Sequence, residues 1–321
     1  MPALIGFVLA VAITPVAAAV ARRTGLVDRP VDELKIHPAP VPVIGGVAVV
    51  GAALAAWAWE GSVGGWVAGA AAAVLLAGLL DDVRSLPPWV RLVPQAIAGW
   101  MLTLGGLSIA PLGGLMGDAV LIVAAMALAN AVNMVDGQDG LAGGLGAIAA
   151  LGLALVLLRA GLGTTSVLTL GGALGGFLVF NLPPARVYLG DGGAYAVGIL
   201  LAAGAARASE GGWSGLVAAG ACLGVFAYEL VASVLRRLVA GSPAARGDRE
   251  HTYDRLAIRL GSRIASTAVM WVLGVLASLL GLAAAGLAPW VAAAIAAAAL
   301  AMAASADTML LPVAAFRRSH P

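Results

Sequence analysis

Apolar residues run along this chain in long, continuous stretches that are separated by short polar or glycine-rich segments. Most stretches are long enough for a helix to cross a lipid bilayer, which takes about 20 predominantly apolar residues. The pattern predicts an all-α, polytopic membrane bundle of about eleven transmembrane helices. The expected spans are residues 3–21, 43–59, 62–80, 89–110, 117–134, 140–158, 164–181, 193–208, 213–235, 265–286 and 288–306.

The composition indicates the same class of protein. Hydrophobic residues make up 61% of the chain and charged residues 11%, whereas a typical soluble domain carries about 25% charged residues. The net charge of +2 is too small to indicate nucleic-acid binding, and the single cysteine, Cys222, excludes an internal disulfide. No positive residue precedes the first apolar run, so we interpret it as a retained span and expect residues 1–321 to form a single membrane domain.

Basic residues decide the expected orientation, because cytoplasmic loops are enriched in Lys and Arg. With the N-terminus outside, all but two of the 18 Lys and Arg residues fall on the inner side, and only Arg159 and Arg207 stay outside. We therefore expect an external N-terminus and a cytoplasmic C-terminus. The acidic motifs then gather on the cytoplasmic face, in inner loops at about residues 22–42, 81–88, 135–139, 182–192 and 236–264.

One polar segment interrupts the apolar sequence near its middle. Amide and carboxylate side chains recur there at every third position: Asn130, Asn133, Asp136 and Asp139. Positions three apart are neighbours on a helix, and Gly137 and Gly140 allow the backbone to break or to approach a ligand closely. A polar seam between helices would explain one such side chain. Four of them at regular spacing, at a depth where polar groups are costly, favour a binding site.

Two more acidic motifs lie at the ends of predicted spans. Asp81 and Asp82 close the third span, and the repulsion between adjacent carboxylates suits general-base work or binding of a divalent cation. Asp191 lies between Gly190 and Gly192 before a helix start, where backbone N–H groups can bind phosphate and the carboxylate can bind Mg²⁺. Each motif alone is compatible with a solvated surface, but their location on one side indicates a site.

The inner loops also carry cationic residues. His251, Arg255 and Arg259 are four residues apart, so on a helix they form one stripe. This stripe has two open interpretations: binding of substrate phosphate, or contact of an interfacial helix with anionic lipid headgroups. In the first inner loop, Lys35 and His37 are flanked by prolines that predict an ordered, non-helical loop.

Together these motifs resemble the polyprenyl-phosphate N-acetylhexosamine-1-phosphate transferases, a family of membrane enzymes that includes the phospho-MurNAc-pentapeptide translocase. The segment from Asn130 to Ala142 is similar, position for position, to the family signature Asn-x-x-Asn-x-x-Asp-Gly-x-Asp-Gly-Leu-Ala. The loop from Gly25 to Gly46, the pair at Asp81 and the segment from Asn181 to Gly193 resemble its other motifs in the same order.

The resemblance implies transfer of a sugar 1-phosphate from a UDP-sugar to a polyprenyl phosphate, with release of UMP, as the first membrane step of a cell-envelope glycan pathway. It implies an enzyme of the inner (plasma) membrane that depends on Mg²⁺, with Mn²⁺ as a substitute, and it leaves a homodimer open. The implied catalytic residues are Asp81, as the base for the lipid phosphate, Asp82, Asp136 and Asp139. The implied metal ligands are Asp191 and Asp136. The implied substrate-binding residues are Asn130, Asn133, Lys35, His37, Asn181, His251 and Arg255.

The chain departs from the family pattern in its last long inner loop. Many members carry several histidines there, whereas this chain has only His251, so a multi-histidine mechanism cannot apply. The difference favours the branch that uses UDP-GlcNAc-like donors over the MurNAc-pentapeptide branch. The alternative function is a secondary transporter with an acidic, cation- or proton-coupled site, which would hold its carboxylates near the bilayer midplane.

Overall fold

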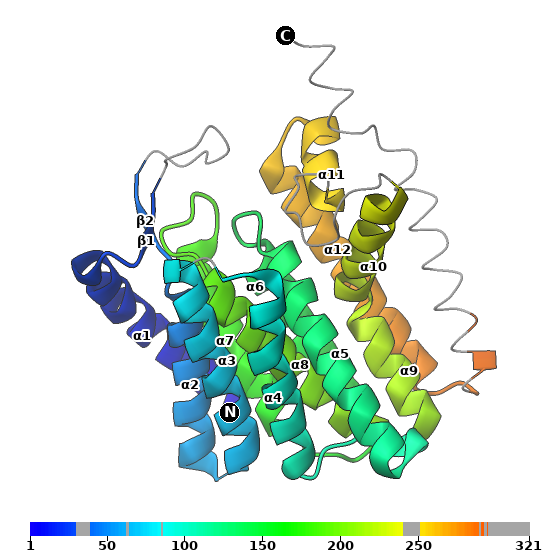
Figure 1. The fold of residues 1–321 in the computed structure, drawn as a ribbon. Coiled ribbons are helices and arrows are strands. Elements are labelled where there is room, and N and C mark those ends of the chain that lie inside the picture. Colours follow the sequence, from blue (N-terminus) through cyan, green and yellow to red (C-terminus); the bar gives the residue numbers. More distant parts are fainter. Residues whose placement is uncertain are drawn as a thin grey trace.

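The computed structural model describes residues 1–29, 39–61, 64–84, 86–239 and 251–288, together with residues 290, 291 and 294. Within these ranges the chain is helical apart from one short pair of strands (Figure 1). The helices are α1 (Pro2–Thr24), α2 (Gly45–Glu60), α3 (Gly65–Arg84), α4 (Pro88–Leu104), α5 (Gly114–Val135), α6 (Leu141–Arg159), α7 (Thr165–Asn181), α8 (Gly190–Ser209), α9 (Gly212–Cys222), α10 (Gly224–Val239), α11 (Thr252–Leu260) and α12 (Arg263–Ala284), with a 3₁₀ turn, η1, at Ala110–Leu112. Strands β1 (Val27–Asp28) and β2 (Val41–Pro42) pair antiparallel.

Helices occupy the predicted spans up to residue 286, and the last predicted span lies almost entirely outside the described residues. By length and hydropathy, five of the described helices can cross a membrane, namely α1, α3, α5, α6 and α12. The number becomes six if α9 and α10 count as one bent span, while α2 and α7 are apolar but shorter. The all-α membrane fold is therefore confirmed, and the number of spans and the orientation stay predictions.

The predicted span at residues 213–235 is not one continuous helix. α9 ends at Cys222, α10 begins at Gly224, and the two helices are bent by 68°. Glycine favours such a break because it has no β-carbon and stabilises a helix poorly. Both halves are apolar enough to hide the bend in the hydrophobic pattern, and tertiary contacts of α10 with α5 and α12 accompany it.

Helix α8 is the most deeply buried helix near the polar motifs, and its start is held by very close contacts. A β-carbon on Gly78 of α3 would collide with the backbone of Gly192, and one on Gly46 of α2 would collide with the backbone of Gly193. Small residues of this kind let helix backbones approach closely. As a result, the first turn of α8, which carries Asp191, lies directly against the last turns of α3.

Loops from distant parts of the sequence meet at one end of the bundle, where Figure 1 shows β1, β2 and α11. The Tyr188 N–H donates to the Pro42 carbonyl at 2.8 Å, which joins the loop before α8 to the strand pair. On the other side, Tyr253 Oη donates to the Met134 carbonyl at 3.0 Å, and Gln138 Nε2 donates to the Tyr253 carbonyl at 3.2 Å. These bonds join α11 to the last turn of α5 and to the polar segment that follows it.

Candidate active site

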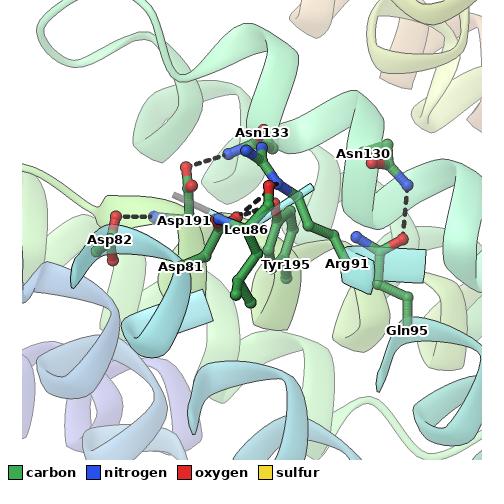
Figure 2. Close-up of polar contacts among 9 residues, drawn as sticks. All are labelled: Asp81, Asp82, Leu86, Arg91, Gln95, Asn130, Asn133, Asp191 and Tyr195. Carbon is green, nitrogen blue, oxygen red and sulfur yellow. Dashed lines mark hydrogen bonds and ion pairs between the residues drawn. The ribbon is translucent and has the colours of Figure 1, made fainter. Parts of the chain in front are cut away.

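Three helices contribute polar side chains to one cluster at this end of the bundle. Asp82 lies in the last turn of α3, Asn133 in the last turn of α5 and Asp191 in the first turn of α8. The Asp191 N–H donates to Asp82 Oδ1 at 3.1 Å, and Asn133 Nδ2 donates to Asp191 Oδ1 at 2.6 Å (Figure 2). Asp82 and Asn133 are 51 positions apart in the sequence, and Asn133 and Asp191 are 58 positions apart, so three distant motifs meet in space.

Asp136 joins these residues directly after the end of α5. Burial, followed by the negative charges of Asp191, Asp82 and Asp139, raises the pKa of Asp136 to about 8. In the absence of a bound cation this carboxyl is therefore largely protonated at neutral pH. We refer to Asp82, Asp136 and Asp191 as the carboxylate cluster. Its crowding of negative charge makes it a place where a cation would be favoured.

Asp81 is adjacent to the cluster but has different surroundings. It is 2% exposed, and its Oδ1 accepts the Leu86 N–H at 2.7 Å. Its Oδ2 is 2.9 Å from Arg91 Nε and accepts Tyr195 Oη at 3.1 Å (Figure 2). Both oxygens are therefore in use, which favours a role in holding Arg91. The base role of Asp81 stays a prediction, and this geometry does not favour it.

One carboxylate oxygen of Asp82 lacks a hydrogen-bond partner among the described residues. Its Oδ2 is buried and makes no hydrogen bond within the part of the chain that the structure describes. That part contains no ready-made group of three or more His, Cys, Asp or Glu side chains that could hold a metal ion. Mg²⁺, however, is commonly held by one or two carboxylates, with water and substrate phosphates as its other ligands. The open oxygen of Asp82, next to Asp191 and Asp136, fits such a site.

Two amides predicted to bind substrate instead make contacts inside the protein. Asn130 Nδ2 donates to Gln95 Oε1 of α4 at 2.6 Å, to one side of the cluster in Figure 2. Asn181 is 3% exposed; its Oδ1 accepts the Gly140 N–H at 3.0 Å, and its Nδ2 donates to the Val187 carbonyl at 2.9 Å. This geometry favours structural roles for both residues, of the polar-seam kind.

The other residues predicted to form the site lie in different places. Asp139 Oδ2 accepts the Ala185 N–H at 2.9 Å, which ties the turn after α5 to the loop before α8 at the edge of the cluster. In α11 and just before it, His251 and Arg255 are 6% and 8% exposed, whereas Arg259 is exposed. The predicted cationic stripe is thus buried at its start and open at its end. Lys35 and His37 lie outside the described residues.

Several residues that shape this region were not identified from the sequence. Tyr195 donates to Asp81, Tyr253 anchors α11, and Glu229 of α10 lies 3.5 Å from His251. The two tyrosines sit next to stronger motifs and have no spacing signal of their own. Glu229 did have a signal, because an acidic residue inside an apolar span is rare and is a functional candidate by default.

The fold and the cluster together define a class: an integral membrane protein with an acidic site, suited to a cation and phosphate groups, at one end of a helical bundle. The model of glycosyl transferase family 4 matches residues 65–209. An undecaprenyl-phosphate alpha-N-acetylglucosaminyl 1-phosphate transferase of Thermotoga maritima is 30% identical over 252 residues, which cover 78% of this chain and 79% of that protein. The chain therefore belongs to glycosyl transferase family 4, and the expected family is confirmed.

Two further relatives have different coverage. A probable undecaprenyl-phosphate N-acetylglucosaminyl 1-phosphate transferase of Bacillus subtilis is 27% identical over 289 residues, or 83% of this chain and 79% of that protein. A phospho-N-acetylmuramoyl-pentapeptide-transferase of a Synechococcus strain is 44% identical, but over 119 residues, or 35% of this chain and 30% of that protein. The similarity to the first kind of transferase therefore extends over most of the chain.

Proposed function

We propose that this protein transfers an N-acetylhexosamine 1-phosphate from a UDP-sugar to a polyprenyl phosphate in the membrane. A phosphate oxygen of the lipid attacks the β-phosphorus of the UDP-sugar, the bond from that phosphorus to the bridging oxygen breaks, and UMP leaves. The product is a polyprenyl-diphospho-sugar, which begins a cell-envelope glycan. The observation that carries the proposal is the convergence of Asp82, Asp136 and Asp191 from three helices in a chain of this family.

The proposed catalyst is a cation site. Asp191 and Asp136 are the carboxylates that we assign to Mg²⁺, or to Mn²⁺ as its substitute, and Asp82 offers its open oxygen beside them. When bound there, Mg²⁺ would neutralise the diphosphate and stabilise the UMP leaving group. Asn133 holds the Asp191 carboxylate in place through its 2.6 Å hydrogen bond.

The lipid phosphate needs little help to become a nucleophile, because a phosphate monoester is already largely ionised at neutral pH. We therefore assign Asp81 to orienting the Arg91 guanidinium, through the 2.9 Å ion pair, and not to removing a proton. Arg91 is 30% exposed next to the cluster, so it is our candidate for binding a substrate phosphate. His251 and Arg255 are candidates for a second phosphate contact on the α11 side.

The donor sugar belongs, in this proposal, to the UDP-GlcNAc type. The lone His251 in place of a histidine cluster supports this choice. So does the similarity of most of the chain to N-acetylglucosaminyl 1-phosphate transferases, whereas two pentapeptide transferases match 35% and 47% of the chain.

A purified preparation tests the reaction directly. The protein in detergent–lipid micelles is incubated with Mg²⁺, polyprenyl phosphate and one of three donors: UDP-GlcNAc, UDP-GalNAc or UDP-MurNAc-pentapeptide. We expect UMP release that requires the lipid and that is fastest with an N-acetylhexosamine donor. A folded protein that releases no UMP with any donor would contradict the proposed function.

The proposed site faces the cytoplasm of an inner-membrane enzyme with about eleven spans and an external N-terminus, as the distribution of Lys and Arg favours. Cysteines introduced at two exposed positions test this: Arg186→Cys in the loop before α8 and Glu210→Cys at the opposite end of α8. An impermeant thiol reagent added to intact cells should label position 210 and leave position 186 unlabelled. The reverse pattern would invert the orientation. Assembly into a homodimer stays a prediction.

The location of the acids also bears on the transporter alternative. Asp82 lies at the end of α3, Asp136 follows α5, and Asp191 begins α8. A transporter site would place its carboxylates near the bilayer midplane, typically where helices are broken. Helix ends are instead the place where a water-soluble donor can meet a lipid acceptor, and no observation favours transport.

A further inference from the structure

A second buried acidic group lies apart from the carboxylate cluster, between α10 and the start of α11. Glu229 and Ser233 are four residues apart on α10, so they share one face, and both are 0% exposed. Opposite them lie His251 and Thr252, which are 6% and 8% exposed. Burying a carboxylate is costly unless specific partners compensate it, so Glu229 needs an explanation.

A single oxygen of the Glu229 carboxylate contacts two groups. Oε2 is 3.5 Å from His251 Nδ1 and accepts the Thr252 N–H at 3.4 Å. Ser233 Oγ is 3.2 Å from the same His251 nitrogen, and Arg236 donates to Ser233 Oγ at 3.1 Å. Glu229 and Ser233 therefore both contact the His251 ring at Nδ1.

A purely structural role explains only part of this arrangement. His251 is the N-cap of α11 but makes no side-chain capping bond, so the Glu229 carboxylate supplies an acceptor and a negative charge at this helix start. A neutral glutamine would supply the same acceptor for Thr252. Oε1 of Glu229, however, is buried and has no hydrogen-bond partner among the described residues. Helix capping therefore does not account for a full carboxylate.

A stacking contact also restrains the orientation of the His251 ring. It stacks on Tyr253 with 5.2 Å between ring centroids and 3° between planes. Tyr253 Oη in turn donates to the carbonyl of Met134, which lies next to Asn133 of the site. Nδ1 is occupied by the α10 side chains, and Nε2 makes no hydrogen bond within the described residues. Nε2 is thus the nitrogen left for a ligand.

We infer that Glu229 is a positioning residue that holds His251 with Nδ1–H as a donor and so leaves Nε2 for the substrate. When the ring is protonated, both nitrogens donate, and Nε2–H is then suited to a phosphate oxygen. A carboxylate that fixes one imidazole nitrogen and thereby orients the other is a common device of histidine sites. Only the kinetic consequence of this inference rests on the proposed transfer reaction.

The first test reads the histidine directly and needs no substrate. The chain has three histidines, so ¹⁵N-histidine labelling with His251→Ala for assignment gives the tautomer of His251 by NMR. We expect Nδ1 to be protonated in the wild-type protein. In Glu229→Gln, the loss of the negative charge next to Nδ1 should shift the ring toward the Nε2–H tautomer. Glu60→Gln, at the far end of α2, is a matched control with a buried, unpartnered carboxylate oxygen, and it should leave the His251 signals unchanged.

The second test is kinetic. Glu229→Gln should lower kcat/KM for the UDP-sugar by about tenfold or more, the size expected for a misdirected charge-assisted hydrogen bond. In a His251→Ala background the same change should cost less than about twofold, because residues that act through one another are not additive. Glu229→Asp keeps the charge and should retain the Nδ1–H tautomer and most of the activity, which covers the case in which Glu229→Gln does not fold.

Three outcomes would overturn the inference: an unchanged His251 tautomer in a folded Glu229→Gln protein, equal kinetic losses with and without His251, or loss of the Nδ1–H tautomer in Glu229→Asp. Failure of the proposed function is a separate result. It would appear as a wild-type protein that releases no UMP, and the NMR test would still decide the role of Glu229.

Discussion

Two neighbouring aspartates at the end of α3 have opposite surroundings. Asp81 faces Arg91 of α4 and Tyr195 of α8, and each of its oxygens accepts a hydrogen bond or an ion pair. Asp82 faces the start of α8, and one of its oxygens is buried without a partner in the described part of the chain. Adjacent residues on a helix point about 100° apart, so they meet different neighbours. We therefore expect Asp81 to support the architecture and Asp82 to be the carboxylate that takes part in the proposed cation site.

The same contrast separates the two amides of α5. Asn130 is paired with Gln95 in a seam between α4 and α5, whereas Asn133, three positions later, is paired with Asp191 in the carboxylate cluster. A regular sequence spacing therefore does not give its members equal roles. Substitutions inside the carboxylate cluster and substitutions next to it should have different consequences. The following predictions test this difference.

The largest effect should come from the carboxylate cluster. Asp191→Asn keeps the shape of the side chain but removes the charge that we assign to Mg²⁺, so UMP release should fall at least about a hundredfold. The melting temperature in detergent should change little, because the Asn133 contact can be retained. Near-normal turnover at ordinary Mg²⁺ concentrations would show that Asp136 or Asp82 holds the ion without Asp191.

The next effect concerns pH. In the folded protein, Asp136 has its pKa raised to about 8, against about 4 for an ordinary aspartate. The folded state therefore holds a proton that the unfolded state loses, and stability from this group falls as the pH rises from about 4 to about 8. Mg²⁺ must displace the same proton, so its apparent affinity should rise by up to about tenfold per pH unit below pH 8.

Thermal unfolding with Mg²⁺ titrations at pH 6.5 and 7.5 measures this coupling. Without Mg²⁺, the melting temperature should be lower at the higher pH, and added Mg²⁺ should reduce the difference. Asp136→Asn provides the control, because it removes the proton and should weaken the pH dependence of the Mg²⁺ midpoint. Equal midpoints at both pH values in the wild-type protein would argue against a cation at Asp136.

The two aspartates of α3 give a paired test of intermediate size. Asp82→Asn should lower turnover about tenfold or more and leave the melting temperature unchanged or higher, since it relieves repulsion with Asp191. Asp81→Asn should lower stability by about 1–3 kcal/mol through the weakened contacts with Arg91 and Tyr195, at the low end because Arg91 is partly exposed. Thermal unfolding and UMP release are measured on both variants. A loss of stability in Asp82→Asn, together with a loss of turnover alone in Asp81→Asn, would contradict the different roles of the two aspartates.

The smallest effect is expected in the α4–α5 seam. Asn130→Ala removes the 2.6 Å hydrogen bond to Gln95 and should cost about 1 kcal/mol of stability, with turnover reduced by no more than about twofold. Asn133→Ala is the matched variant at the next position of the same spacing, and it should reduce turnover much more because it releases Asp191. A large loss of turnover in a stable Asn130→Ala protein would instead support the substrate-binding role of Asn130.

The hydrophobic pattern was sufficient to predict most of the described helices, because the length and apolarity of a membrane helix are local properties of the chain. The acidic motifs were likewise sufficient to predict that Asp82, Asp136 and Asp191 lie at one end of the bundle. The family resemblance is confirmed by the comparisons. These features depend on which residues are present and in what order, so they can be read without coordinates.

Other features depended on contacts between distant segments. The 68° bend at Leu223, the commitment of Asn130 and Asn181 to structural bonds, and the pairing of Glu229 with His251 all involve partners that local sequence does not specify. The distinction between Asp81 and Asp82 is of the same kind. The sequence by itself determined which groups are present and at which end of the helices they lie, whereas the tertiary structure alone decided which of them are satisfied, because that depends on the direction of each side chain and on close helix contacts such as Gly78 with Gly192.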